Sequence, residues 1–370
     1  MLRKFTVEGY KGFRSLLEFN LAAHKYDFNE RLVKTGVVKN ATIYGKNGIG
    51  KSSLGSALFD IVIHLTDTKP MSDRYLVNYL NLDEVKKNYA QFSYEFVFGD
   101  DVVVYSYQKT APTEMKWEEL TINGRLLVRY DFNDRKSLKI DAEVVGSLNV
   151  ELPDKHLSVV KYLYRNLNKT TIPALTKLVQ FCEGMLWYRS LSDGNRYAGF
   201  TNGVHGIYEE ICSMKKIKEF QHFLAQNDLN YDLDTRYFNG KLTIYAKFAN
   251  GKKAVPFASV ASTGTNALSL FFFWKMFTGK KMTFLFIDEF DAFFHYEAAE
   301  VVVRNLNDEE GFQTVLTSHN TYLMNNKLTR PDCCYIMTNN KIRSLCDCTE
   351  REIREAHNLE KMYVNGAFCE

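Results

Sequence analysis

The sequence predicts an α/β fold that carries antiparallel β-hairpins and an inserted helical subdomain. Short apolar, β-branched runs followed by helical stripes predict buried parallel strands in the first and last thirds of the chain. Aromatic residues alternate with polar ones from 90 to 130, which is typical of antiparallel strands, and from about 154 to 226 the apolar period becomes helical. We therefore expect an N-terminal lobe at 1–148, a helical subdomain at 149–254 and a C-terminal lobe at 255–370.

A phosphate-binding loop is predicted between 41 and 53. It contains Gly45-x-x-x-x-Gly50-Lys51-Ser52, with strand-forming residues before it and a helical apolar stripe from Leu54 to Leu65 after it. The glycines let successive N–H groups face an anion at a helix N-terminus, Lys51 can reach the β- and γ-phosphates, and the Ser52 hydroxyl can join a Mg²⁺ site. The sequence thus predicts that the chain binds a nucleoside triphosphate. The residues expected around it are Gly45, Lys46, Asn47, Gly48, Ile49, Gly50, Lys51, Ser52 and Ser53.

Composition sets broad limits. The 370 residues are 45% hydrophobic and 25% charged, as in globular proteins, and the net charge of +3 neither shows nor excludes a nucleic-acid surface. No apolar run reaches the roughly 18 residues of a membrane span, and the start of the chain lacks the apolar core of a signal peptide. Seven scattered cysteines favour a reducing cytoplasm. Cys333, Cys334, Cys346 and Cys348 lie close together, but their spacing is not C-x-x-C, and adjacent cysteines in a strand point to opposite faces, which disfavours a zinc site.

The N-terminal lobe opens with two predicted strands, Phe5–Gly9 and Leu16–Leu21. A strand is also expected at 41–44, and hairpins follow in the region from Ala90 to Tyr130. Asn123-Gly124 is the strongest hairpin signal, because both residues accept the left-handed backbone of a tight turn.

Three helices are expected in the middle, at His156–Asn168, Ile172–Leu191 and Val204–Gln226, followed by a strand at Leu242–Phe248. The cluster Lys215, Lys216 and Lys218 is a solvated helix face in the plainest interpretation. The last third should hold a helix at 295–306 and a closing helix opened by the capping box Thr349-x-x-Glu352. Its expected strands are Thr283–Ile287, Thr314–Thr317, Cys334–Met337 and Ile342–Leu345.

The run Phe284-Leu-Phe-Ile-Asp288-Glu289 has the Walker B form. An Asp at a strand end can hold Mg²⁺, and an adjacent Glu can orient or deprotonate an attacking water. Ser262-Thr263-Gly264-Thr265 precedes an apolar helix from Ala267 to Phe277, and His319 follows the later strand.

This order resembles that of the ABC-type ATPases, and within them the RecF-like and overcoming-lysogenization-defect branch of AAA-family ATP-binding proteins found in bacterial defence operons. The stretches that carry the resemblance are Glu8–Ser15, Ile287–His295, Thr317–Thr321 and His357–Gly366. It implies an ABC-ATPase-like P-loop NTPase head, two of which pair head-to-tail around ATP and Mg²⁺.

The resemblance also implies roles for single residues. Ser262 and Gly264 would contact the γ-phosphate held by the other subunit's P-loop, although Ser262-Thr-Gly-Thr departs from the leucine-serine-glycine-glycine-glutamine form of transporters. Glu289 would be the general base and His319 a γ-phosphate sensor, acting with Lys51; Asp288 and Ser52 would hold the metal, and Asp291 would contact the partner head. Gln91 and Gln108 are candidates by order for the glutamine loop, and Phe13 or Arg14 for a contact with the base.

Two features of the family's larger members are not found in the sequence. The insertion lacks the sustained heptads of a coiled coil, and no nuclease domain follows Ser344. The leading hypothesis is a stand-alone cytoplasmic ATPase that forms a homodimer or higher oligomer around ATP, as the sensor or scaffold of an anti-phage or abortive-infection system with a separate effector. The alternatives are a DNA-repair or DNA-end-binding ATPase that uses Lys215, Lys216 and Lys218, and a nucleotide-gated scaffold with little turnover.

Overall fold

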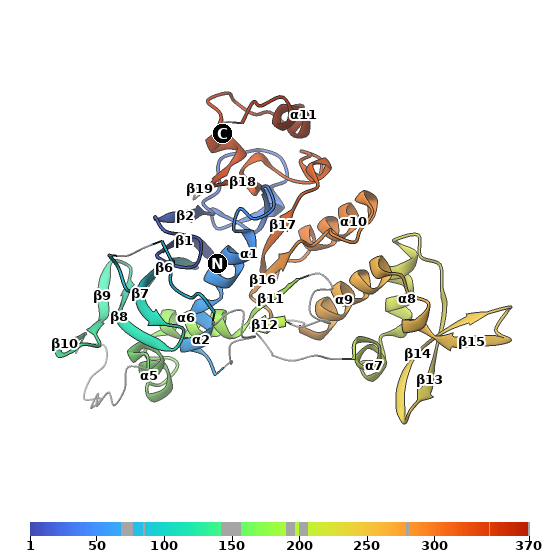
Figure 1. The fold of residues 1–370 in the computed structure, drawn as a ribbon, viewed down its shortest axis with the longest axis horizontal. Coiled ribbons are helices and arrows are strands. Elements are labelled where there is room, and N and C mark those ends of the chain that lie inside the picture. Colours follow the sequence, from blue (N-terminus) through green and yellow to red (C-terminus); the bar gives the residue numbers. More distant parts are fainter. Residues whose placement is uncertain are drawn as a thin grey trace.

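The computed structural model describes residues 1–67, 77–83, 86–141, 157–189, 197–199, 206–278, 281–339 and 341–368. Two seven-stranded sheets form the body of the molecule, and a three-stranded sheet lies at the far end of a helical unit (Figure 1). Within the described ranges, no helix combines the length and apolarity needed to cross a bilayer.

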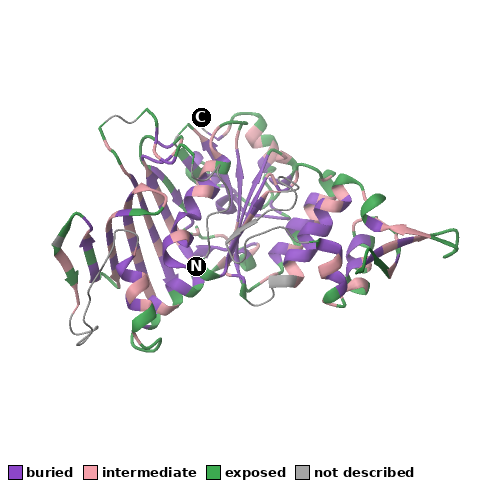
Figure 2. Cartoon of the chain, turned by 60° about the horizontal axis from the view of Figure 1, so that its bottom comes forward, coloured by how far each residue is buried: buried purple, intermediate pink, exposed green. Residues whose placement is uncertain are grey.

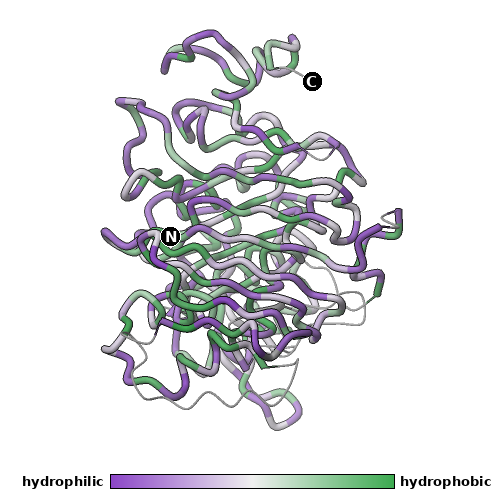
Figure 3. The backbone as a smooth tube through the Cα atoms, turned by 90° about the vertical axis from the view of Figure 1, so that its left-hand side faces the viewer, coloured by the Kyte–Doolittle hydropathy of each residue, from purple (hydrophilic) through white to green (hydrophobic). Residues whose placement is uncertain are grey.

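The first sheet is antiparallel throughout, in the order β10-β9-β8-β7-β6-β1-β2, which confirms the predicted hairpins. Asn123 and Gly124 both have positive φ, 52° and 77°, and the Asn123 side chain accepts a hydrogen bond from the Val102 N–H at 2.8 Å. Figure 3 shows these strands side by side, with hydrophobic and hydrophilic residues alternating along them. The strands are β1 (Leu2–Glu8), β2 (Leu17–Asn20), β6 (Ala90–Phe98), β7 (Asp101–Ala111), β8 (Glu114–Ile122), β9 (Arg125–Asp131) and β10 (Asp134–Ile140).

The second sheet has the order β12-β11-β16-β17-β5-β18-β19, and its five inner strands are parallel. Every residue of β16 and β17 is buried, as expected for strands covered on both faces (Figure 2). The carboxyl ends of the parallel strands lie along one edge, so the segments that follow them are brought together. The strands are β5 (Asn40–Tyr44), β11 (Met185–Arg189), β12 (Tyr197–Gly199), β16 (Phe284–Asp288), β17 (Gln313–Ser318), β18 (Cys334–Thr338) and β19 (Lys341–Ser344).

The helical stripe after the P-loop is divided. It forms α1 (Lys51–Leu58) and α2 (Asp60–Leu65), because the chain leaves the helix at Phe59. The first predicted middle helix is confirmed as α5 (Val159–Asn166), which begins at a Ser158 N-cap. α6 (Pro173–Glu183) packs with α2, α5 and the first sheet.

The helix predicted at Ile172–Leu191 is wrong in its second half. α6 stops at Glu183, and Met185–Arg189 form β11, which pairs in parallel with β16. Gly184 makes this transition: a Cβ there would lie 2.4 Å from the Lys281 carbonyl oxygen. The periodicity of the aromatic and apolar residues of β11 fits a helix or a strand equally well. Pairing with β16 makes this segment a strand.

The expected third helix begins, at Val204, outside the described residues, and its described part forms two helices. α7 (Ile207–Ser213) and α8 (Ile217–Ala225) are separated at Lys215, which has φ 57°. Together with α9 (Thr263–Thr278) they form a helical unit that carries the small sheet β13-β14-β15 (Figure 1). The predicted domain limits, 1–148, 149–254 and 255–370, stay predictions. Within the predicted helical subdomain, however, α5 and α6 contact the first sheet and β11 belongs to the second sheet. The small strands are β13 (Asp232–Phe238), β14 (Lys241–Phe248) and β15 (Lys253–Pro256).

The capping box predicted at Thr349 is wrong. The Thr349 hydroxyl accepts from the Arg351 N–H in a local turn, and the closing helix α11 (Leu359–Val364) begins later, capped by Asn358, whose side chain accepts from the Lys361 N–H at 2.8 Å. Asn358 caps the helix instead of Thr349 because its short polar side chain lies directly before the apolar residues of α11. The predicted helix at 295–306 is confirmed as α10 (Tyr296–Asn307). The remaining elements are η1 (Glu30–Leu32), β3 (Val33–Lys34), β4 (Val37–Val38), η3 (Phe257–Ser259), η5 (Thr321–Leu323), η6 (Pro331–Cys333) and η7 (Leu345–Cys348).

Buried residues fall into two hydrophobic clusters, one between the two large sheets and one on the other face of the second sheet, which continues into the helical unit. Cys333 belongs to the first and Cys334 to the second, which confirms that these adjacent cysteines face opposite ways. A buried ion pair ties α2 to the first sheet: Lys109 Nζ lies 2.6 Å from Asp60 Oδ1, both side chains are fully buried, and the Tyr79 and Tyr107 hydroxyls also donate to Asp60.

Candidate nucleotide site

The candidate site lies at the carboxyl ends of β5, β16 and β17. The P-loop follows β5, Asp288 ends β16, and His319 follows β17. β17 lies between the other two strands in the sheet, so its end is placed between the P-loop and the acidic pair Asp288-Glu289.

The P-loop backbone depends on two glycines in the left-handed region, Gly48 at φ 76° and Gly50 at φ 109°. A Cβ on Gly50 would also lie 3.3 Å from both the Phe13 ring and the Met337 side chain. Helix α1 begins directly after Gly50, at Lys51, so its first N–H groups are directed at the loop, where an anion is favoured.

Lys51 is held inside the loop. Its ammonium donates to the carbonyl oxygens of Gly45 at 2.7 Å and Lys46 at 3.0 Å, and it lies 3.1 Å from His319 Nε2. Only 6% of the surface of this residue is exposed. Burial lowers the pKa of Lys51 from its usual value, while the carboxylates of Asp288, Glu289 and Asp291 act in the opposite direction. The ammonium is thus positioned to exchange loop carbonyls for phosphate oxygens.

Asp288 is fully buried and has both carboxylate oxygens engaged. Ser52 Oγ donates to Oδ2 at 2.5 Å, and Thr317 Oγ1 donates to Oδ1 at 2.7 Å. A serine hydroxyl and a carboxylate in direct contact are the hard oxygen ligands that Mg²⁺ prefers, so these residues fit the metal of an ATPase site. That Ser52 and Asp288 hold the metal stays a prediction.

Glu289 has φ 49°, a conformation that non-glycine residues rarely adopt. Its N–H donates to Thr317 Oγ1 at 2.7 Å, which links its backbone to the side chain that also holds Asp288. The Arg189 guanidinium contacts both oxygens of the Glu289 carboxylate, with Nε 3.0 Å from Oε2 and Nη2 2.5 Å from Oε1. Arg189 Nε also lies 3.9 Å from Asp288 Oδ2. The candidate base is therefore paired with a cation.

Asp291 lies within hydrogen-bonding distance of the same strand end. Ser318 Oγ donates to its carboxylate at 2.5 Å, and burial raises the pKa of Asp291, an effect that the Ser318 bond and His319 oppose. The side chain of His319 is exposed apart from its contact with Lys51.

The two remaining phosphate contacts expected from the resemblance lie elsewhere. Ser262 is exposed and caps α9, accepting from the Thr265 N–H at 3.1 Å, and a Cβ on Gly264 would lie 2.8 Å from the Phe293 carbonyl oxygen. The described contacts of Ser262 are to Thr265 and Asn266 in α9, and Gly264 lies against the segment after Asp291, so neither residue is described in contact with the P-loop of the same chain. Gln91 and Gln108 pair with each other across β6 and β7, with Gln108 donating at 3.1 Å.

The sequence assigns no role in the site to Arg189 or Thr317. Thr317 lies directly before the Ser318-His319 pair, so its place in a strand end was a usable signal. Arg189 gives none, because the sequence predicts a helix for the segment that carries it, and only sheet pairing sets it beside Asp288. Lys216 is paired with Glu219 at 2.7 Å, in keeping with a solvated face.

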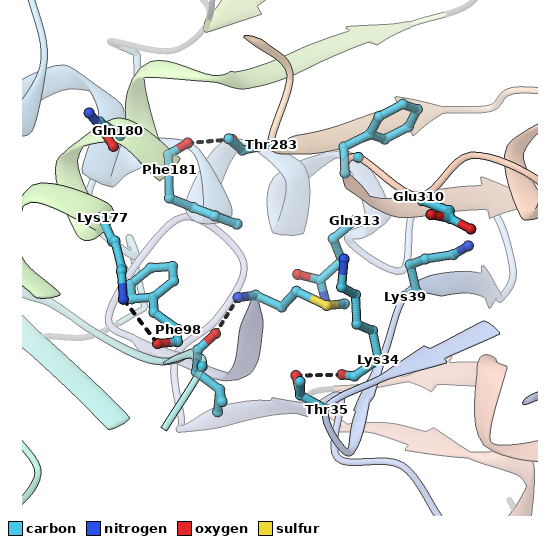
Figure 4. A pocket seen from close by; sticks show the side chains of 15 residues that line it. Lys34, Thr35, Lys39, Phe98, Lys177, Gln180, Phe181, Thr283, Glu310 and Gln313 are labelled. Atoms are coloured by element: carbon cyan, nitrogen blue, oxygen red, sulfur yellow. Dashed lines mark hydrogen bonds between the residues drawn. The ribbon is translucent and has the colours of Figure 1, made fainter. Parts of the chain in front are cut away.

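A separate cavity of about 440 Å³ lies at the opposite end of the second sheet. Thr283 and Gln313, at the amino ends of β16 and β17, line it together with Lys34, Lys39 and Lys177 (Figure 4). None of the predicted site residues borders it, so this cavity is distinct from the nucleotide site.

A family model described as "AAA domain, putative AbiEii toxin, Type IV TA system" matches residues 41–325. No curated protein matches the sequence. Among solved structures, the SMC head domain from Thermotoga maritima is 14% identical with a TM-score of 0.45, covering 93% of this chain and 98% of that chain. An Smc head domain derived from Pyrococcus furiosus is 14% identical with a TM-score of 0.47, covering 93% and 96%. The recombination mediator protein RecF with ATP is 12% identical with a TM-score of 0.35, covering 93% and 99%.

The family match shows an AAA-domain chain, and the sheet topology confirms the predicted α/β fold with antiparallel β-hairpins and a helical unit. The matched range begins in β5 and ends just after η5, so it includes the P-loop, the Walker B strand and His319.

Proposed function

We propose that this chain, which belongs to the AAA-domain family matched over residues 41–325, binds ATP with Mg²⁺ and hydrolyses it. The observation that carries the proposal is the convergence of Lys51, Ser52, Asp288, Glu289 and His319 at one sheet edge, within a network of direct contacts. A base, a cation for the phosphates and two oxygen ligands for a metal are the parts that phosphoryl transfer to water requires.

Each residue has a distinct role in this proposal. Lys51 and the N–H groups of the P-loop bind the β- and γ-phosphates, and Ser52 and Asp288 hold the metal, which neutralises charge on the phosphates. Glu289 accepts a proton from the attacking water at its carboxylate, and His319 donates to the γ-phosphate from the strand end beside Lys51.

The site of one chain is proposed to be completed by a second copy. Ser262 and Gly264 lie at the start of α9, where the helix N-terminus favours a phosphate, but in one chain Ser262 contacts Thr265 and Gly264 lies against the segment around Phe293, rather than the P-loop. Phe293, Tyr296 and Tyr322 are exposed aromatic side chains next to this segment, which suits a surface covered on association. A head-to-tail pair would place α9 of one chain against the nucleotide of the other.

The biological role proposed is that of an ATP-dependent sensor or scaffold acting in the cytoplasm with a separate effector in an abortive-infection or anti-phage system. The family's description, which names an AbiEii toxin and a Type IV toxin–antitoxin system, supports it. Within the proposal, hydrolysis separates the two heads and ends the signal.

DNA binding is the second candidate, and one surface favours it. The small sheet β13-β14-β15 projects from the helical unit (Figure 1) and exposes Tyr237 and Phe238 at 75% and 51%. Lysines at 241, 247, 252 and 253 accompany them, and aromatic and basic side chains together suit single-stranded nucleic acid. Binding that weakens steeply with added salt would support this candidate.

The deciding experiment compares Glu289→Gln with the wild type. Light scattering gives the mass with Mg·ATP, with Mg·ADP and without nucleotide, and phosphate release gives turnover. We expect the variant to form a lasting dimer in ATP while hydrolysis falls by about 10²-fold or more, because the base is lost while the ligands for ATP stay. If the mass never changes and the variant hydrolyses ATP at the wild-type rate, the composite site and the role of Glu289 are both wrong.

A further inference from the structure

Three side chains of different chemistry converge where the segment after β2 meets the segment after β19. His24, Cys346 and Asp347 offer ligand atoms that all lie within 4.8 Å of one another. His24 Nε2 lies 3.2 Å from Asp347 Oδ1. The two segments come from opposite ends of the sequence, so the folded structure, rather than a sequence motif, creates this cluster.

The backbone of His24 is fixed by a buried ion pair. Its N–H donates to Asp332 Oδ2 at 2.9 Å, and its carbonyl oxygen accepts from the Arg330 guanidinium at 2.8 Å. Arg330 and Asp332 are 3% and 0% exposed and hydrogen-bond to each other at 2.7 Å. A charged pair this deeply buried is costly to break, so the position of the His24 backbone is well determined.

The other two side chains share one supporting hydroxyl. Ser344 Oγ donates to the Asp347 carboxylate and lies 3.0 Å from Cys346 Sγ. Hydrogen bonds that orient the ligands in this way accompany metal sites in proteins and tune their affinity.

We propose that His24, Cys346 and Asp347 form a zinc-binding site that joins the segment after β2 to the segment after β19. Imidazole nitrogen, thiolate sulfur and carboxylate oxygen are the three protein ligand types of Zn²⁺. Around a tetrahedral ion with bonds of about 2.0–2.3 Å the ligand atoms lie about 3.5 Å apart, so side-chain rotations that move them by about an ångström complete the site.

The fourth position opens toward solvent. His24 and Asp347 are each 47% exposed, and the cluster borders a groove of about 1060 Å³ that is also lined by Glu30 and Glu350. Water can fill that position. The site differs from the one at Ser52 and Asp288, where only oxygen ligands meet, as Mg²⁺ prefers.

The test uses the whole chain without nucleotide, with excess Mg²⁺ present so that the Ser52–Asp288 site does not take up zinc. Zinc retained after dialysis is measured by metal analysis, and Co²⁺ is used as a spectroscopic probe. The variants are His24→Gln, Cys346→Ser and Asp347→Asn, with His222→Gln and Cys212→Ser as matched controls elsewhere in the fold. We expect one zinc per wild-type chain and a loss of affinity of about tenfold or more in each of the three variants.

The cobalt spectrum separates a metal site from loose surface binding. A sulfur-to-cobalt charge-transfer band should be present in the wild type and in Cys212→Ser and absent in Cys346→Ser. Zinc should also raise the melting temperature of the wild type more than that of the three variants, because it binds only the folded form. If no zinc is retained, or if the three substitutions leave retention and spectrum unchanged, the proposal is overturned and the cluster is a surface ion pair with a neighbouring thiol.

Discussion

Replacing Arg189 with Gln should release the candidate base. In the structure the guanidinium occupies both oxygens of the Glu289 carboxylate, at 2.5 and 3.0 Å, so the carboxylate must leave this cation before it can take a proton from water. Gln keeps most of the side chain's volume and removes the charge. Hydrolysis should therefore become faster, not slower.

The size of the effect follows from exposure and geometry. The Arg189 and Glu289 side chains are 35% and 32% exposed, and pairs screened by water to this extent contribute at most about 1 kcal/mol. The two-point contact and the nearby Asp288 carboxylate, 3.9 Å from Arg189, put this pair at the upper end of that range. About 1 kcal/mol corresponds to about a fivefold rise in turnover.

The assay is steady-state phosphate release at saturating ATP, with Mg²⁺ titrated. Loss of Arg189 should also lower the Mg²⁺ concentration needed for half-maximal activity, because a competing cation next to Asp288 is gone. Arg129→Gln, which breaks a pair with Glu119 on the first sheet, is the matched control and should leave both quantities unchanged. Turnover in Arg189→Gln at or below the wild-type level, with ATP binding intact, would refute the reasoning and make Arg189 part of the catalytic machinery.

Three further predictions concern the P-loop and the buried polar groups. Gly50→Ala forces an alanine to φ 109° against Phe13 and Met337, so the affinity for ATP, measured by calorimetry, should fall by about 10-fold or more. Gly36→Ala is the control: Gly36 also has a positive φ but has open space around it, so this variant should bind ATP like the wild type. Lys109→Met leaves the buried Asp60 carboxylate without its cation and should lower the free energy of unfolding in urea by about 3 kcal/mol; a loss below about 1 kcal/mol would show that the Tyr79 and Tyr107 hydroxyls suffice. Burial raises the pKa of Glu118 to about 6, despite hydrogen bonds from Ser158, Val159 and Tyr105. The folded chain therefore binds this proton more tightly than the unfolded chain, and the contribution of Glu118 to the free energy of unfolding should fall by about 2 kcal/mol as pH rises from about 4.5 through 6. Glu118→Gln should remove that pH dependence from urea titrations taken across the range.

The parts of the site that the sequence predicted are those that local chemistry dictates. A loop that surrounds phosphate with N–H groups needs glycines next to a lysine, and a carboxylate at the end of a buried strand needs an apolar run before it, so Lys51 and Asp288 could be identified without a structure. Most of the parallel strands were also predictable, because strands buried on both faces are continuously apolar.

The parts that the sequence did not reveal depend on contacts between distant segments. Met185–Arg189 could be a helix or a strand, and only hydrogen bonds to β16 settle the matter; Arg189 then follows from that pairing. The left-handed backbone of Glu289 likewise has no local cause, since glycine is the residue favoured there, and it is held by the Thr317 hydroxyl from the next strand.

The order of strands explains how the charged and polar groups of the candidate site are brought together. Across the sheet edge, β11 supplies the Arg189 cation, β16 the two carboxylates, β17 the Thr317 hydroxyl and the histidine beyond it, and the loop after β5 the Lys51 cation. In this arrangement each charged group already has partners within the chain: Lys51 donates to loop carbonyls, Asp288 accepts from Ser52, and Glu289 pairs with Arg189. Under the proposed function, ATP with its metal would bind by replacing these internal contacts with its own, and we predict that replacing the last pair, between Arg189 and Glu289, is the step that limits hydrolysis.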